Sequence, residues 1–138
     1  MDIRALTQSY AVSAQIAPSD LPAIKAAGYT TVIDNRPDAE IPPELHTSVM
    51  REAAEALGMT FVAIPIVPGS LGAPQVAAQA QAMAAAEGPV FAYCASGNRC
   101  SVLWALTQAG NASADELIAI PAKFGYNLEH LREVLMHP

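Results

Sequence analysis

The sequence lacks three features that would point to particular classes of protein. Its two cysteines have no regular spacing, which argues against a disulfide framework and against a zinc site. Its seven Lys and Arg residues are outnumbered by thirteen Asp and Glu, and a net charge of −6 argues against a nucleic-acid partner. No apolar run is long enough to span a membrane. We therefore expect no metal, no cofactor, no nucleic acid and no membrane.

Length and composition favour one helix-rich domain. The 138 residues fit a single domain, 1–138, and the sequence is rich in alanine with only 6% aromatic residues. This balance favours closely packed helices over an all-β core. The opening Met1-Asp2-Ile3-Arg4 is not typical of a signal peptide, so we expect a cytoplasmic location with reduced thiols.

Apolar runs alternate with helical patterns along the chain. Short apolar runs typical of strands lie at Tyr10–Ser13, Thr31–Asp34, Thr60–Ile64 and Val90–Tyr93. Helical patterns lie at 20–27, 48–57, 73–86, 100–109, 114–125 and 128–136. This alternation predicts an α/β fold with a mainly parallel sheet surrounded by helices.

The segment Cys-Ala-Ser-Gly-Asn-Arg, Cys94–Arg99, joins the last predicted strand to the helix after it. Its backbone N–H groups and the helix N-terminus favour an anion, and Arg99 adds a planar fork of donors. Such a loop lowers the pKa of a cysteine, so we predict that Cys94 is a nucleophile. The residues predicted to bind substrate through the loop are Ala95, Ser96, Gly97 and Asn98. The alternative, a cysteine that is merely buried in the core, leaves Gly97 and Arg99 unexplained.

Loop length separates two kinds of cysteine chemistry. Four residues lie between Cys94 and Arg99, whereas the protein tyrosine phosphatases that this loop resembles have five. The rhodaneses have the form Cys-x-x-Gly-x-Arg, which Cys94–Arg99 matches. By that resemblance, Cys94 carries sulfane sulfur as a persulfide.

Several segments together carry a wider resemblance. They are Gln15-Ile16, Val32–Asp38, Ile64-Pro65, Cys94–Arg99 and Gly125–Leu128. In this order the chain resembles the beta-lactamase-hydrolase-like protein, phosphatase-like domain family. The resemblance implies a three-layer α/β/α fold like that of dual-specificity phosphatases, with a central, mainly parallel sheet of four to five strands. It also implies that Cys94 is the nucleophile and that Arg99 binds the anion.

A cysteine phosphatase usually needs a general acid to protonate the leaving oxygen, and its loss costs about 10²–10⁴-fold in rate. The resemblance places the acid's loop at 65–71, which contains no Asp, Glu or His. Sulfur transfer has no such need, because its leaving group is stable without a proton. Asp34 or Asp38 could supply the acid from another loop, although Asp38 is also a common kind of turn residue.

Three residues outside Cys94–Arg99 have alternative interpretations. Cys100 stands where such loops usually carry Ser or Thr, so it is either a small packing residue or a redox partner that forms a disulfide with Cys94. Arg36 follows a predicted strand. It either stabilises the loop near the site without touching substrate, or it is a solvated or salt-bridged arginine. Asp38 is the other residue that could support the site in this way.

We therefore predict a cysteine-dependent sulfurtransferase that moves sulfane sulfur from thiosulfate or a persulfide to a thiol acceptor through a Cys94 persulfide. A phosphatase acting through a Cys94 phosphocysteine is one alternative. A module that senses oxidants or persulfides through Cys94 and Cys100 is another. The expected partners are thus a small anionic sulfur donor and a thiol acceptor, and the sequence leaves the oligomeric state open.

Overall fold

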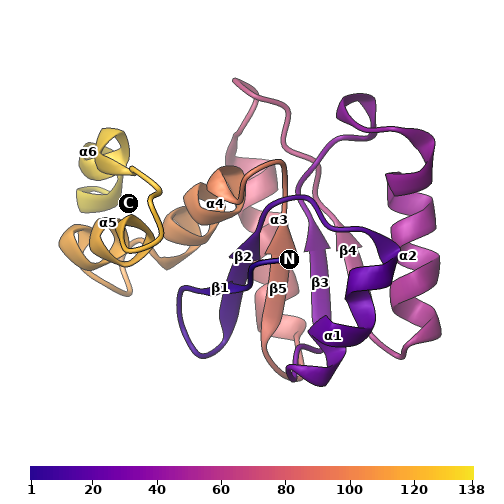
Figure 1. The fold of residues 1–138 in the computed structure, drawn as a ribbon. Helices are drawn as coiled ribbons and strands as arrows, with labels where there is room; N and C mark the ends of the chain where they lie inside the picture. Colours follow the sequence, from indigo (N-terminus) through magenta and orange to yellow (C-terminus); the bar gives the residue numbers. More distant parts are fainter.

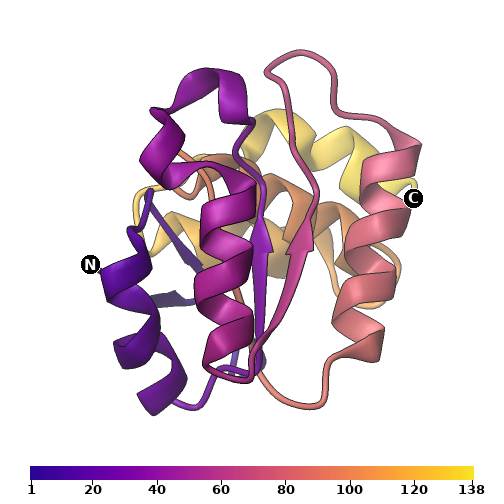
Figure 2. The ribbon, with the colours of Figure 1, turned by 90° about the vertical axis from the view of Figure 1, so that its right-hand side faces the viewer.

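A computed structural model describes residues 1–138. They form one five-stranded sheet with helices on both of its faces (Figures 1 and 2). The strands are β1 (Arg4–Ala5), β2 (Tyr10–Ser13), β3 (Thr31–Asp34), β4 (Thr60–Ala63) and β5 (Val90–Tyr93). The α-helices are α1 (Leu21–Ala26), α2 (Thr47–Ala56), α3 (Ala73–Ala85), α4 (Asn98–Gln108), α5 (Ala114–Ala122) and α6 (Arg132–Met136). The short 3₁₀ turns are η1 (Pro18–Asp20), η2 (Asp38–Glu40), η3 (Pro43–Leu45) and η4 (Glu129–Leu131).

The strand order β1-β2-β5-β3-β4 places β5 in the middle of the sheet. β5 is parallel to both neighbours, with Tyr93 opposite Ser13 on β2 and Asp34 on β3. β4 is parallel to β3, and only β1 runs antiparallel. The carboxyl ends of β2, β3 and β5 therefore meet at one edge, which is where open α/β sheets bind ligands.

Two apolar cores cover the two faces of the sheet. On one face, α1 and α2 bury Ile24 and Met50 against Val32. On the other face, α4 and α5 bury Leu103 and Leu117, and α3 packs against the same core. Figure 1 shows the sheet between α1 and α2 on one side and α4 to α6 on the other. This confirms the expected three-layer α/β/α fold.

Most predicted elements are confirmed, and the differences have local causes. β1 was not predicted, because two residues are too few to show a periodic pattern. The helix predicted at 100–109 begins earlier, at Asn98, because Gly97 supplies the left-handed residue before it. The helix predicted at 128–136 divides into η4 and α6.

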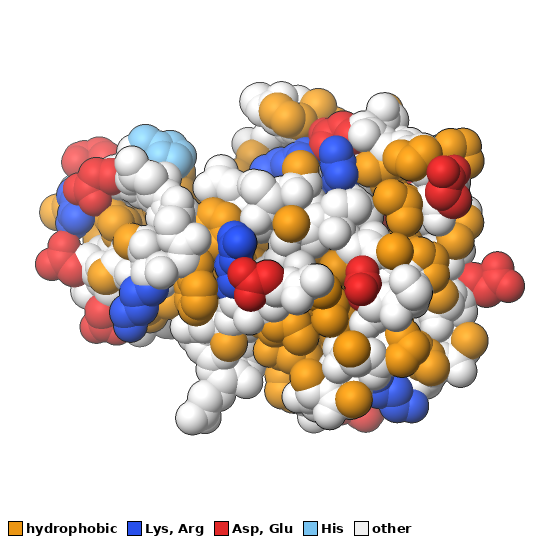
Figure 3. Space-filling view, viewed as in Figure 1, with side chains coloured by type: hydrophobic (Ala, Val, Ile, Leu, Met, Phe, Trp, Pro, Cys, Tyr) orange, Lys and Arg blue, Asp and Glu red, His pale blue; other side chains and the backbone are white.

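No helix of residues 1–138 combines the length and the apolar character needed to cross a membrane. On the face shown in Figure 3, basic and acidic side chains occur in small mixed groups among apolar and uncharged ones.

Candidate active site

The segment between β5 and α4 closes into a tight loop around the Cys94 sulfur. Cys94 directly follows β5, and α4 begins at Asn98. Gly97 precedes the helix with a φ of +96°, a left-handed conformation that residues with a side chain rarely adopt. The predicted succession of strand, loop and helix is confirmed.

Cys94 is held as a thiolate. Its side chain is fully buried, and the Gly97 N–H donates a hydrogen bond to its Sγ at 3.1 Å. The largest effect on the pKa of Cys94 is a hydrogen bond from the Cys100 thiol, which lowers the pKa, whereas burial raises it. Backbone N–H groups of Cys100, Gly97 and Ser96 add to the effect of this hydrogen bond, and together they lower the pKa of Cys94 to about 5. At neutral pH the sulfur is therefore charged and nucleophilic.

Cys100 lies in the first turn of α4 with its thiol against Cys94. It is fully buried, and burial, followed by the interaction with Cys94, raises the pKa of the Cys100 thiol well above its usual range. The pair therefore consists of a thiolate at Cys94 and a protonated donor at Cys100. Both cysteines are buried in the same apolar core, and the function of Cys100 as a redox partner stays a prediction.

Arg99 forms an end-on ion pair with Glu40. Its Nη1 donates to Glu40 Oε2 and its Nη2 to Oε1, both at 2.8 Å, and Nη1 also donates to the Ile66 carbonyl at 2.7 Å. The hydrogen bonds with Glu40, together with the charge of the nearby Cys94 thiolate, raise the pKa of Arg99 against the effect of burial. The guanidinium is thus fixed beside the cysteine loop.

Glu40 is itself held by a second arginine. Arg36 Nε donates to Glu40 Oε1 at 3.2 Å, and Arg36 Nη1 donates to Gln15 Oε1 at 3.2 Å. Gln15 in turn donates its backbone N–H to the Ala95 carbonyl of the cysteine loop. The Arg99 contact first, and then the Arg36 contact, lower the pKa of Glu40, which stays a carboxylate. Arg36 thus reaches the site through Glu40 and Gln15.

The two aspartates considered as proton donors have other partners. Asp38 Oδ1 accepts a hydrogen bond from the Thr47 N–H at 2.8 Å, at the first residue of α2. Asp34 is 1% exposed and accepts hydrogen bonds from the Arg36 N–H and the Thr47 hydroxyl, both at 2.9 Å. Burial raises the pKa of Asp34. Both carboxylates therefore organise the turn after β3, and neither has a hydrogen bond to the cysteine loop.

The remaining loop residues are placed as follows. Ala95, Ser96 and Asn98 are exposed, whereas Gly97 is buried. The Asn98 N–H donates to Ser96 Oγ at 3.2 Å, so this amide stabilises the turn itself. The exposed Asn98 side chain makes no hydrogen bond within the chain, and the Ala95 side chain is an exposed methyl group.

Two residues that contact this site, Glu40 and Tyr126, were not predicted. Glu40 lies 59 positions from Arg99, and its only sequence signal is the i,i+4 spacing from Arg36. Tyr126 follows α5, yet its hydroxyl donates to the Ser96 carbonyl at 2.7 Å. Tyr126 belongs to a segment that carried the family resemblance, but nothing local predicts its contact with the loop.

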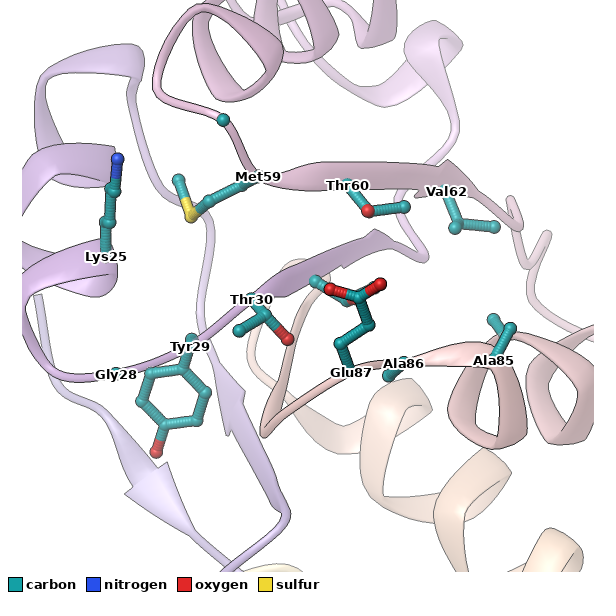
Figure 4. Close-up of a pocket in the computed structure, with 13 residues that line it drawn as sticks. Lys25, Gly28, Tyr29, Thr30, Met59, Thr60, Val62, Ala85, Ala86 and Glu87 are labelled. Atoms are coloured by element: carbon teal, nitrogen blue, oxygen red, sulfur yellow. The ribbon is translucent and has the colours of Figure 1, made fainter.

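A cavity of about 400 Å³ lies away from the cysteine loop (Figure 4). Thr60 and Val62 of β4 face Ala85 at the end of α3 across it, and Tyr29 lines it near the start of β3. Because the strands are parallel, this cavity is at the opposite end of the sheet from Cys94. Residues 1–138 contain no cluster of three or more His, Cys, Asp or Glu side chains that could hold a metal ion.

A buried thiolate after the central strand, a loop of backbone amides and an arginine at the start of the next helix define a phosphatase-like α/β protein with a cysteine active-site loop. Residues 2–111 match the sequence model of the family described as "Beta-lactamase hydrolase-like protein, phosphatase-like domain", and the chain belongs to this family.

Individual proteins of similar sequence carry the same description as the family. A beta-lactamase hydrolase-like protein of Agrobacterium fabrum is 34% identical over 104 residues, which are 75% of this chain and 24% of that protein. One of Xylella fastidiosa Temecula1 is 28% identical over 130 residues, which are 93% of this chain and 30% of that protein. This chain thus spans less than a third of either relative.

A crystal structure from Neisseria meningitidis Z2491, described as that of a candidate phosphatase, shares the fold along almost the whole chain. It is 34% identical, has a TM-score of 0.84, and the match covers 98% of this chain and 96% of that one.

The prediction of a sulfurtransferase is wrong, because the family and the Neisseria structure both point to phosphatase chemistry. The loop length indicated how the backbone encloses an anion, and a thiolate beside an arginine serves either chemistry. The lack of an acid in 65–71 weakened the case for a phosphatase without indicating sulfur. The sulfur donor and the thiol acceptor were expected only as partners of that function.

Proposed function

We propose that this chain is a cysteine-dependent phosphatase that hydrolyses phosphate monoesters through a phosphocysteine on Cys94. The observation that carries the proposal is the thiolate of Cys94, with a pKa of about 5, held within hydrogen-bond distance of the Gly97 N–H beside Arg99. A charged nucleophile inside an anion-binding loop is suited to attack phosphorus.

The reaction has two displacements. The Cys94 thiolate attacks phosphorus, the P–S bond forms, and the ester P–O bond breaks with its electron pair going to the leaving oxygen. Water then attacks the phosphocysteine, the P–S bond breaks, and inorganic phosphate and the thiolate are released. Arg99 and the loop amides stabilise the phosphoryl oxygens in both steps. The Cys100 thiol donates to the sulfur when it leaves as a thiolate in the second step.

Glu40 is the residue that prepares Arg99 for this task. Its carboxylate binds one edge of the guanidinium, Nη1 and Nη2, and so sets the direction of the guanidinium beside Cys94. An arginine whose fork is already oriented loses less conformational entropy when it binds phosphate. Because Glu40 is ionised and paired, it serves as a positioning residue and not as a proton donor.

A redox function of the same site is a second proposal. Cys94 and Cys100 are buried in the same apolar core, and the Cys100 thiol is the main cause of the lowered pKa of Cys94. Hydrogen peroxide would oxidise the Cys94 thiolate to a sulfenic acid, and Cys100 would displace water from it to form a disulfide. Two free cysteines in the reduced state suit a cytoplasmic location, which we also propose.

The direct test is hydrolysis of p-nitrophenyl phosphate by the wild-type chain and by Cys94→Ser. We expect turnover by the wild type and none by the variant, which keeps the shape of the side chain but lacks the thiolate. Equal rates in the two proteins, or no turnover by the wild type at any pH between 5 and 8, would contradict the proposal.

A further inference from the structure

One peptide unit of the loop, Ser96–Gly97, is engaged at both ends. Its carbonyl oxygen accepts the hydroxyl hydrogen of Tyr126 at 2.7 Å. Its N–H, contributed by Gly97, donates to the Cys94 Sγ at 3.1 Å. In a trans peptide the carbonyl and the N–H point in opposite directions. The Tyr126 hydroxyl, by binding the Ser96 carbonyl on one side, therefore orients the Gly97 N–H toward the Cys94 sulfur on the other side.

Tyr126 is fixed by an arginine from the far end of the chain. Arg4 on β1 donates from Nη1 to the Tyr126 hydroxyl at 2.6 Å, and its guanidinium lies 5.4 Å from the centre of the Tyr126 ring. Tyr126 is only 6% exposed. Its hydroxyl thus accepts from a cation and donates to the loop carbonyl, which are the two roles that a phenol oxygen can fill together.

Gly97 makes this approach possible. A Cβ at position 97 would lie 2.2 Å from the Tyr126 hydroxyl oxygen, closer than any real contact. Position 97 therefore requires glycine for two reasons. The backbone has a positive φ, and a side chain would block the Tyr126 hydroxyl from the peptide next to Cys94.

We infer that Tyr126, backed by Arg4, is a positioning residue that orients the Ser96–Gly97 peptide so that its N–H stabilises the Cys94 thiolate. The hydrogen bonds form one chain from the Arg4 cation through the phenol and the peptide to the sulfur anion. Each bond polarises the next in the same direction, so the chain is stronger than its separate parts. The inference rests on Cys94 as the nucleophile of the proposed phosphatase.

Tyr126 also lies beyond residues 2–111, the part that matches the family model. The segment after α5 thus contributes to the site through this hydroxyl.

The test measures the pH dependence of Cys94 alkylation by iodoacetamide, followed by mass spectrometry of the Cys94 peptide. Tyr126→Phe keeps the ring and removes the hydroxyl, and we expect the alkylation midpoint to rise by about 0.5–1 pKa unit. Tyr29→Phe is the matched control, because Tyr29 lines the cavity at the opposite end of the sheet, and its midpoint should equal that of the wild type.

Arg4→Gln separates a hydrogen-bond chain from a simple electric field. If Arg4 acts through the phenol, its substitution raises the midpoint in the wild-type background and has little further effect in Tyr126→Phe. Additive shifts in the double variant would overturn the chain. An unchanged midpoint in both single variants would overturn the positioning role, and Arg4→Gln remains informative if Tyr126→Phe does not fold.

Alkylation needs no phosphate ester, so this result is independent of the proposed function. A raised midpoint without phosphatase activity would support the positioning of the thiolate and contradict the proposed phosphatase. Phosphatase activity with an unchanged midpoint would support the proposed phosphatase and contradict the positioning role of Tyr126.

Discussion

Glu40 and Arg99 meet end-on, with both carboxylate oxygens accepting from the two Nη atoms at 2.8 Å. The two side chains come from different elements, η2 and α4, and they are 27% and 17% exposed. The contact links the turn after β3 to α4, the helix that carries Arg99. It fixes the direction of the guanidinium before any substrate arrives.

Replacing Glu40 should therefore weaken phosphate binding. We expect Glu40→Gln to lower kcat/KM for an aryl phosphate about tenfold or more, since a charge-assisted pair is lost and Arg99 gains freedom. The inhibition constant of inorganic phosphate should rise in parallel. Glu44→Gln, an exposed acidic residue of η3, is the control and should keep wild-type values. Wild-type kinetics in Glu40→Gln would show that the pair is not needed.

The leaving group should depart without help from a protein carboxylate. Glu40 is paired with two arginines, Asp34 and Asp38 bind backbone and hydroxyl groups around Thr47, and 65–71 carries no acid. We expect kcat/KM across a series of aryl phosphates to fall about tenfold for each unit that the pKa of the leaving phenol rises.

A designed acid provides the matching experiment. Val67 is 52% exposed and follows Ile66, whose carbonyl contacts Arg99. Val67→Asp should flatten the dependence on the leaving group and raise the rate for poor leaving groups, by at most about 10²-fold. Val67→Asn is the control, because its amide side chain cannot act as a general acid. A flat dependence already present in the wild type would mean that another group protonates the leaving oxygen.

The strands and the cysteine loop could be predicted from sequence because their signals are local. Val90–Tyr93 is a continuous apolar run, and Gly97 and Arg99 follow at the spacing of an anion loop. The contacts that complete the site join residues far apart in sequence, such as Arg4 and Tyr126, which are separated by 122 positions. No propensity or spacing rule reaches across such distances.

The chemistry could not be chosen from sequence for a related reason. Cys94 and Arg99 in a short loop suit either sulfur or phosphorus, because both substrates are anions that react with a thiolate. Glu40 pairs with Arg99 only in the folded chain. The distinction came from membership in the family.

Thiolate formation should make stability depend on pH. The folded pKa of Cys94 is about 5, against an ordinary value near 9, so the unfolded chain binds more protons between these values. Stability therefore rises with pH from about 5 to 9, by at most about 1.4 kcal/mol per pH unit, and is lost as pH falls through the folded pKa. Thermal unfolding of the wild type and Cys94→Ser should diverge across this range. Parallel curves would argue against a buried thiolate.

Oxidation should be reversible only when Cys100 is present. After treatment with hydrogen peroxide, we expect the wild type to recover activity with dithiothreitol, because a Cys94–Cys100 disulfide protects the sulfur from further oxidation. Cys100→Ser keeps a hydrogen-bond donor and should keep turnover, but its peroxide inactivation should be permanent. Equal recovery in the two proteins would reduce Cys100 to a donor and packing residue.

The central claim is that phosphate passes through the Cys94 sulfur, and trapping the intermediate tests it most directly. The wild type is mixed with an excess of p-nitrophenyl phosphate, quenched within the first turnover and digested for mass spectrometry under conditions that preserve the P–S bond. We predict a phosphorylated peptide whose modification maps to Cys94 and which is missing in Cys94→Ser. Turnover with no phosphate on Cys94, or with phosphate on another residue, would contradict the account.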